Sequence, residues 1–420
     1  MKYLILFFFL SFSLIGQTNW TCTNDIYVDY IKSVKFHVNG LFLTMPLIDL
    51  GSQSQLVLSF DDLTGQTKNY SYKIVHCTRD WEPSNIPEME YLDGFSEERI
   101  IDFGFSYKTI VNYVHYQATL PGPYFKWTKS GNYLLIVYEE GYKDRPIFTQ
   151  RFMVVEPALR IAHQMVRPAQ ASKMRTHQEI DFSVSYDNFP FRSPRQEVTA
   201  TVIQNGRWDN AILNIPPLFE RLNQLVFDYQ DQIVFPGGKE FRPLDIRSLR
   251  FRNNRIEKIV EYFDRFEVIL FPEKERNDQV FFNYRDLNGN FILENTDRND
   301  AELAGNYVEV FFSLATPSYI PGKEVCITGG FSNWRCYEEN RMEYNENLGG
   351  YFGRILLKQG YYDYGFALFE DPSSSESPDF SALEGDWYET QNEYTILIYY
   401  RPFGGRFDRL IGATTFASGF

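Results

Sequence analysis

Short segments in which apolar and polar residues alternate recur through residues 26–155. Clear examples are residues 34–38, 56–60, 70–77 and 133–138, and turn residues separate them. Alternation with a period of two places successive side chains on opposite faces of a strand, and short strands at close spacing are typical of a β-sandwich. This part of the chain is therefore predicted to be a β-sandwich.

The same pattern continues in two further blocks. Pro157 marks the end of the first block, and Thr316-Pro317 marks the start of the third. Asn288-Gly289 lies between two apolar runs and predicts a hairpin. We therefore expect an all-β protein made of three consecutive immunoglobulin-like or E-set-like β-sandwiches, at residues 17–157, 158–312 and 313–420.

Residues 1–16 have the layout of a secretory signal peptide. Lys2 precedes an apolar run at residues 3–15, and small or polar residues follow. The run is shorter than the roughly 20 residues that span a bilayer. We expect cleavage near Gln17 and export of the remaining chain.

The composition narrows the possible partners and supports the fold class. The 55 acidic residues outnumber the 41 basic ones, which gives a net charge of −14 and argues against binding to a phosphate backbone. Aromatic residues make up 17% of the chain, which favours strands over helices.

Four cysteines invite the prediction of two disulfides. Cys326 and Cys336 would close a short loop, and Cys22 with Cys77 would tie the mature N-terminus to the first sandwich. An exported chain with an even number of cysteines is compatible with both bonds. Four free thiols remain the alternative, because spacing alone does not determine pairing.

Residues 76–84, HCTRDWEPS, concentrate reactive residue types. A catalytic dyad or a metal site would need His76 and Cys77 on the same side of the strand, but alternation directs them to opposite faces. No Cys-x-x-Cys motif occurs, and the other histidines are isolated in the sequence. We predict a buried, hydrogen-bonded strand end followed by a turn at Asp80 and Trp81.

Other motifs give no support for an enzyme. The DLNGN segment has its glycine at position four rather than six of a calcium loop, and no nucleophile elbow or phosphate loop is present. The carboxylate pair of a glycosidase cannot be recognised from sequence, so that class stays open without support. The sequence predicts no catalytic residue, no cofactor and no metal.

Two arginine-rich segments stand out in this acidic chain. They contain Arg242, Arg247 and Arg250, and Arg406, Asp408 and Arg409. Solvated strand faces with acidic neighbours are the favoured interpretation. The alternative is a strip that binds a partner protein, because arginine is enriched at interfaces.

Several of these segments together resemble the plug proteins of the type IX secretion system, a family of Bacteroidetes. In the first block the resemblance is carried by residues that we expect to be structural, namely His76, Asp80, Trp81, Pro83, Ser84, Tyr91, Gly94, Tyr113, His115 and Tyr116. Later parts are FPGGKEFRPLD at 235–245, DLNGNF at 286–291 and GRFDRLIG at 405–412. Lys239 and Pro243 depart from the asparagine and the aromatic residue that we expect there.

The resemblance implies a non-enzymatic periplasmic protein that docks on the large outer-membrane β-barrel translocon of that system. It would seal the channel from the periplasmic side when no substrate is loaded. No nucleic acid, no membrane span and no cofactor are implied.

The third block also resembles an immunoglobulin-like carbohydrate-binding module of the glycogen-binding type. This resemblance rests on VCITGGFSNW at residues 325–334 and implies that Trp334 could stack on a sugar, although the same tryptophan often closes the core. A periplasmic or surface glycan-binding protein is therefore the alternative function.

Overall fold

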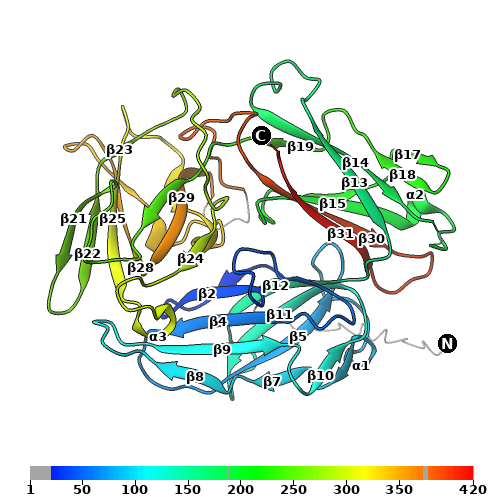
Figure 1. The fold of residues 1–420 in the computed structure, drawn as a ribbon, viewed down its shortest axis with the longest axis horizontal. Coiled ribbons are helices and arrows are strands. Elements are labelled where there is room, and N and C mark those ends of the chain that lie inside the picture. Colours follow the sequence, from blue (N-terminus) through cyan, green and yellow to red (C-terminus); the bar gives the residue numbers. More distant parts are fainter. Residues whose placement is uncertain (1–19, 188, 372–376, 420) are drawn as a thin grey trace, which may run out of the picture.

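The computed structural model describes residues 20–187, 189–371 and 377–419, so the predicted signal peptide lies outside the described residues. Strands account for 46% of the chain and helices for 5%, which confirms the all-β class. Three β-sandwiches surround a common centre (Figure 1). No helix in the described part of the chain has the length and apolar character needed to cross a membrane.

The first sandwich has two main sheets. One contains, in spatial order, β1 (Asp25–Ile26), β12 (Pro146–Val155), β11 (Gly131–Glu139), β5 (Tyr70–Cys77) and β7 (Glu97–Arg99), with β3 (Leu47–Asp49) beside β12. The other contains β2 (Ile31–Val38), β4 (Leu56–Asp62), β9 (Val114–Leu120) and β8 (Asp102–Phe105). Helix α1 (Glu88–Tyr91) leads into a ribbon of β6 (Leu92–Gly94) and β10 (Phe125–Trp127). Both main sheets contribute side chains to one core.

The sheet of β5, β11 and β12 is buried on both faces. Along β11 the residues from Gly131 to Tyr138 are all buried, because one face lies in the core of the first sandwich and the other packs on the second. Leu134 and Ile136 share one hydrophobic cluster with Leu397 and Tyr399 across this interface. The strand therefore carries a continuous apolar run instead of a strict alternation.

The second sandwich also has two sheets. One contains β13 (Arg160–Val166), β14 (His177–Ser185), β18 (Gln224–Phe227) and β17 (Phe219–Arg221), with β19 (Val234–Pro236) beside β14. The other contains β16 (Ile212–Ile215), β15 (Val198–Gln204), β30 (Glu393–Tyr400) and β31 (Arg409–Ala417). Helix α2 (Pro194–Glu197) precedes β15.

The third sandwich is built from the residues between β19 and β30. One sheet contains β20 (Arg242–Asp245), β29 (Gly360–Phe369) and β24 (Phe291–Leu293), with β26 (Glu324–Thr328) beside β29. The other contains β21 (Ile256–Glu261), β22 (Phe266–Leu270), β25 (Tyr307–Ala315), β28 (Gly350–Lys358) and β27 (Glu343–Asn345), with β23 (Glu273–Lys274) beside β25. Its helical turns are α3 (Ala301–Ala304), η1 (Gly330–Ser332) and η2 (Glu338–Asn340).

The predicted boundaries of the second and third domains are wrong, and the sandwiches are not consecutive. Strand β30 pairs antiparallel with β15, with Val198 opposite Tyr400, so residues 393–417 belong to the second sandwich rather than to a domain at 313–420. The third sandwich begins at β20, well before residue 312, and is inserted into the second. Figure 1 shows the red C-terminal strands beside the green strands β13 to β15.

The predicted hairpin at Asn288-Gly289 is only half present. Both residues have positive φ, and the Asn290 amide donates a hydrogen bond of 3.1 Å to the Leu287 carbonyl, so the tight turn forms. Strand β24 follows the turn, but residues 280–285 before it form no strand. The turn therefore delivers β24 to β29 without a preceding partner strand.

Candidate functional site: the interfaces between the sandwiches

His76 ends β5 in the interior of the first sandwich, with 1% of its surface exposed. Its Nε2 atom is 3.2 Å from the Ser130 carbonyl oxygen, and its Nδ1 atom is 2.8 Å from Ser84 Oγ. Burial lowers the pKa of His76 to about 4, so the ring is neutral at pH 7, donates through Nε2 and accepts from Ser84. Cys77 lies on the opposite face, against the second sandwich. The two side chains therefore form no thiol–imidazole pair.

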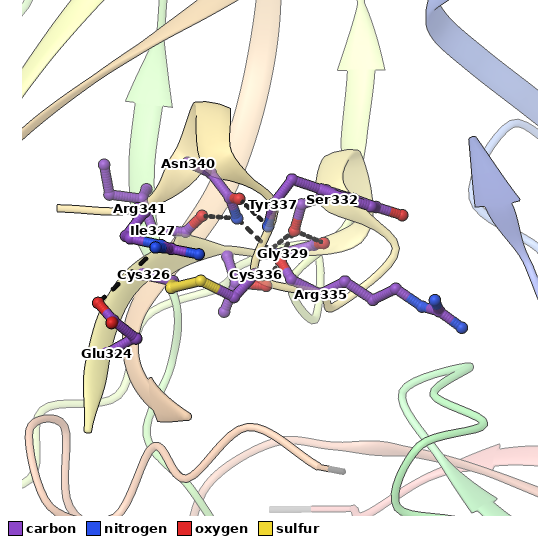
Figure 2. Close-up of a disulfide and its surroundings, with 11 residues drawn as sticks. Glu324, Cys326, Ile327, Gly329, Ser332, Arg335, Cys336, Tyr337, Asn340 and Arg341 are labelled. Carbon is purple, nitrogen blue, oxygen red and sulfur yellow. Dashed lines mark hydrogen bonds and ion pairs between the residues drawn. A yellow bond between two sulfur atoms is a disulfide. The ribbon is translucent and has the colours of Figure 1, made fainter. Parts of the chain in front are cut away.

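The cysteines differ in their pairing. A disulfide joins Cys326 to Cys336, with their Cα atoms 5.7 Å apart (Figure 2). Asn340 stabilises the same loop, because its Nδ2 atom donates to the carbonyl oxygens of Ile327 and Arg335, each at 2.8 Å. Cys22 and Cys77 are free thiols with sulfur atoms 3.8 Å apart. The second predicted bond is not formed, although its two cysteines are in contact.

The turn after β5 lies against the second sandwich. The Arg79 amide donates a hydrogen bond of 3.1 Å to Asp408 Oδ2. The Trp81 ring packs edge-to-face on Trp208 with centroids 4.8 Å apart, and the guanidinium of Arg151 lies 4.4 Å from the Trp81 ring. Trp81 has φ of 62°, an uncommon conformation for a bulky residue. Packing against Trp208 holds the turn in this conformation.

Three more of the residues that were expected to be structural, Asp80, Pro83 and Ser84, complete this turn. Pro83 forms a β-bridge with Cys77, and the Ser84 amide donates to the His76 carbonyl at 2.8 Å. Asp80 accepts a hydrogen bond from Asn214 in β16 of the second sandwich. The turn is thus fixed at both ends in the first sandwich and touches the second at its tip.

Tyr91 and Gly94 belong to the ribbon that covers His76. The Tyr91 hydroxyl donates to the Ile74 carbonyl at 3.3 Å, and its ring lies 5.6 Å from the His76 ring. Gly94 has φ of +118°, and a Cβ atom there would lie 1.9 Å from the Tyr124 carbonyl oxygen. Only glycine fits this close approach of β6 and β10.

Strand β9 and the loop before it face the third sandwich. The Tyr113 hydroxyl lies 3.0 Å from the carbonyl oxygens of both Glu302 and Gly305, at α3. His115 Nδ1 is 2.6 Å from Asp61 Oδ1. Tyr116 instead bonds within the first sandwich, where its hydroxyl donates to the Lys68 carbonyl at 3.0 Å.

Asp61 is the centre of a buried cluster that joins the first and third sandwiches. Lys358 Nζ and the Tyr307 hydroxyl each lie 2.7 Å from its Oδ2 atom, and neither the Asp61 nor the Lys358 side chain is exposed. Burial by itself would raise the pKa of Asp61, but the charge of Lys358 and the hydrogen bonds from His115 and Lys358 hold it below its ordinary value. The carboxylate is therefore ionised and paired inside the interface.

Trp334 lies between the second and third sandwiches and does not form an open sugar platform. Only 8% of its surface is exposed. The Arg207 guanidinium covers it at 4.7 Å, and the rings of Phe241 and Phe380 lie beside it, with centroids 5.4 and 6.1 Å away. Because these three side chains pack around the indole and it is almost fully buried, no open face is left for stacking on a glycan.

Of the six residues predicted as a partner strip, Arg242 and Asp408 are buried and Arg409 is half-buried in an ion pair. Arg242 is 4% exposed, lies 2.9 Å from Glu384 and also pairs with Glu273. Asp408 is 1% exposed. Arg409 Nε is 3.2 Å from Glu156. The partner-strip prediction is wrong for Arg242 and Asp408, because neither reaches the surface.

The other three residues do reach solvent but lie on different sandwiches. Arg247 pairs with Asp245 at 2.8 Å, and Arg250 is exposed beside it in the third sandwich. Arg406 is exposed and pairs with Glu90 of the first sandwich. The structure does not bring the six residues together as one surface.

Asp61 and Lys358, which hold two sandwiches together, could not be recognised from the sequence. Each is a charged residue at the end of an apolar strand, in LVLSFDD and GRILLK. This position was the only signal, and it does not distinguish a buried pair from two solvated charges.

A cavity of about 290 Å³ lies where the three sandwiches meet. Phe42 and Arg151 of the first sandwich, Trp208 of the second, and Trp334 and Arg335 of the third all line it. Among the residues that the structure describes, no group of three or more His, Cys, Asp or Glu side chains is placed to hold a metal ion. The arrangement of these residues fixes three sandwiches in one body.

Comparisons with known proteins agree with this architecture. Residues 31–156 match the family model described as "Type 9 secretion system plug protein 1st domain". A hypothetical protein from Parabacteroides merdae, known from a crystal structure, is 32% identical, with a TM-score of 0.89 over 95% of this chain and 100% of that chain. A search of curated proteins finds no match.

Two further solved structures are only remotely similar. An alkylpurine DNA glycosylase from Pseudomonas fluorescens is 8% identical, with a TM-score of 0.15 over 30% of this chain and 29% of that chain. The collagen adhesin of S. aureus is 7% identical, with a TM-score of 0.10 over 94% of this chain and 95% of that chain.

Proposed function

Because this chain belongs to the type 9 secretion system plug protein family, we propose that it is a non-enzymatic plug that works in the periplasm. It binds the large outer-membrane β-barrel translocon of that system. While no substrate is loaded, it closes the channel from the periplasmic side.

The observation that carries this proposal is the way in which residues that carry the family resemblance, such as Trp81 and Tyr113, join the three sandwiches. The turn at Trp81 contacts the second sandwich, and Tyr113 and His115 lie at the contact with the third. A cover for a wide channel must keep its shape under thermal motion, since relative movement of its parts would open gaps. Large interfaces with buried hydrogen bonds and ion pairs suppress such domain motion.

The charge of the chain supports reversible docking. The net charge of −14 keeps the protein soluble, and charged rim contacts raise association rates more than they raise affinity. A plug has to leave the channel when a substrate arrives, so a polar interface of moderate affinity suits the role better than a large apolar one.

Isolation of the protein from membranes tests the binding step. A tagged protein purified from a detergent extract is expected to bring down the large outer-membrane barrel. Recovery without the barrel, at salt concentrations that preserve other periplasmic complexes, would contradict the proposal.

Permeability tests the sealing step. Cells that lack the protein are expected to become sensitive to antibiotics too large for ordinary porins, and the wild-type gene should restore resistance. His163→Gln, at an exposed position outside the candidate partner strip, serves as the control and should restore resistance equally well. Unchanged antibiotic sensitivity in the deletion strain would contradict the sealing role.

A further inference from the structure

A groove of about 1080 Å³ runs between the first and third sandwiches. Apolar side chains from both sides line it, namely Ile26, Val28, Ile31, Leu270, Phe312, Phe331 and Ile355. In Figure 1 the strands β28 and β24 lie on the side of the third sandwich that faces β2. The groove is lined by residues 352–356 of β28 on one side and by residues 26–29, 31 and 32 of the first sandwich on the other.

The wall of this groove in the third sandwich is a strand edge of β28 that η2 flanks without pairing with it. Strand β27 pairs with β28 only at residues 350–352. In the described chain, the backbone groups of residues 353–356 form no hydrogen bond with backbone outside β25. Five consecutive residues of β28, 352–356, line the groove. Because consecutive residues of a strand point to opposite faces, the groove follows the strand edge rather than one face of the sheet.

The opposite wall is also the edge of a sheet. Strand β1 is the outermost strand of its sheet, and residues 26–29 line the groove. Apolar side chains line the space between the two edges, and the unpaired backbone groups are those of β28. On the β1 side the Ile26 amide bonds to Asp25 Oδ1 and the Tyr27 amide bonds to the Ile147 carbonyl. An exposed strand edge is a template for another strand.

The rim of the groove has an excess of negative charge. Its basic side chains Lys32, Arg341 and Arg354 pair with Glu339, Glu324 and Glu309; the pair of Arg341 with Glu324 is drawn in Figure 2. Four other acidic side chains at the groove form no ion pair with any described residue, namely Asp29, Glu257, Glu338 and Glu343. These carboxylates would attract lysine or arginine side chains.

We propose that this groove binds an extended peptide segment in which apolar and basic side chains alternate. The peptide adds as a strand to the unpaired edge of β28 at residues 353–356. Its backbone pairs with β28, its apolar side chains enter the groove, and its basic side chains reach the acidic rim. Main-chain hydrogen bonds supply affinity in such strand addition, and the side-chain pockets supply specificity.

A synthetic peptide of nine residues, with valine and lysine alternating and both ends blocked, is the probe. Titration into the full protein, followed by calorimetry, should show binding. A peptide with glutamate in place of lysine should bind at least tenfold more weakly because the rim repels it. A peptide N-methylated at every second residue should also bind at least tenfold more weakly because it cannot complete the backbone ladder. Among residues 353–356, the amides that point away from β25 should gain protection from hydrogen exchange, whereas those that already bond to β25 should change little.

Variants of the rim separate this site from a general attraction to an acidic protein. Glu338→Lys with Glu343→Lys changes two exposed side chains and should weaken binding of the basic peptide about tenfold. Glu220→Lys with Glu261→Lys changes the net charge equally at exposed positions outside the groove and should leave the dissociation constant unchanged. Circular dichroism of both variants checks that they fold.

Three results would overturn the proposal. They are equal binding of the three peptides, equal weakening by the two double variants, and exchange protection that appears at another strand while β28 remains unprotected. None of these measurements involves the translocon, so they test peptide binding in the groove independently of the proposed plug function.

Discussion

His76 and its neighbours illustrate how burial decides what a reactive side chain does. The histidine lies at a strand end, has hydrogen-bond partners at both nitrogens and has its pKa lowered to about 4 by burial. In a neutral, buried ring whose two nitrogens both have hydrogen-bond partners, neither nitrogen is free to exchange a proton with a ligand. Its role at this scale is to connect β5, the turn at Ser84 and the loop at Ser130.

The lowered pKa of His76 predicts a dependence of stability on pH. An unfolded histidine has a pKa of about 6.5, so between pH 6.5 and 4 the unfolded chain binds more protons than the folded chain. The stabilisation from neutral His76 is therefore complete above about pH 6.5 and is lost as the pH falls to about 4. Replacing His76 by Gln removes this titration.

Urea unfolding at pH 7 and pH 4.5 measures the effect. The free energy of unfolding of the wild type should fall more between these two pH values than that of His76→Gln, by about 2 to 3 kcal/mol. His163 is exposed and only partial burial lowers its pKa, so His163→Gln serves as the comparison and should differ from the wild type less than His76→Gln does. Parallel curves for wild type and His76→Gln would contradict the assignment.

The disulfide between Cys326 and Cys336 restricts a loop with a sequence separation of 10 residues. A crosslink over a loop of this size removes entropy from the unfolded chain, and replacing both cysteines by serine should lower the free energy of unfolding by about 2 to 3 kcal/mol. Urea unfolding with and without dithiothreitol checks this. The reductant should destabilise the wild type by a similar amount and leave the double variant unaffected; an equal response of the two would contradict the prediction.

At the scale of elements, β30 and β31 decide the architecture of the second sandwich. Strand β30 lies between β15 and β31, and its residues Ile396 and Ile398 are fully buried in the core of that sandwich. The whole third sandwich lies between β19 and β30 in the sequence, and β30 then pairs with β15 of the second sandwich. The second sandwich is therefore complete only when residues far apart in the sequence have met.

Substitutions that create a cavity in one core should show which strands belong to that sandwich. Ile398→Ala in β30 should cost about 2 to 5 kcal/mol and reduce hydrogen-exchange protection in β15 and β30 together. Phe366→Ala in β29, which is equally buried in the third sandwich, should reduce protection in β25 and β29 instead. Loss of protection in β29 after Ile398→Ala, with β15 unaffected, would contradict the insertion.

At the scale of the whole molecule, buried polar contacts join the three sandwiches. The fully buried pair of Asp61 and Lys358 connects the first and third, and the hydrogen bond of 2.7 Å from the Tyr399 hydroxyl to Asn132 Oδ1 connects the second and first. Buried charges and amides tolerate little displacement, because an unpaired buried group is costly. These contacts therefore fix the relative orientation of the sandwiches.

Breaking the buried pair should destabilise the assembled molecule. Lys358→Met leaves the Asp61 carboxylate buried without its partner charge, which should lower the free energy of unfolding by about 3 to 5 kcal/mol. Adding Asp61→Asn should recover part of this loss, because the uncompensated charge disappears.

Arg406→Ala is the matched control, since it breaks an ion pair between the second and first sandwiches whose arginine is exposed. Its cost should stay below about 1 kcal/mol. Chemical unfolding of the four proteins measures these differences. A cost of less than about 1 kcal/mol for Lys358→Met would show that the pair does not hold the interface.

Local patterns in the sequence were sufficient for the class of fold and for the chemistry of single strands. Alternation placed His76 and Cys77 on opposite faces, because the side-chain direction in a strand depends only on neighbouring residues. The short spacing of Cys326 and Cys336 made their pairing easy to propose. The turn at Asn288 and Gly289 was visible for the same reason, since turn conformation depends on a few consecutive residues.

Pairings between distant residues could be decided only by the tertiary structure. An apolar strand such as β30 fits the core of any sandwich, so nothing local selects β15 as its partner. Arg242 looks like a surface residue until Glu384, 142 positions later, lies against it. The sequence by itself thus determined the all-β class and the local geometry of its strands. The tertiary structure decided the insertion of the third sandwich, the burial of Arg242 and Trp334, and the Asp61–Lys358 contact, because burial and charge pairing depend on which distant segments meet.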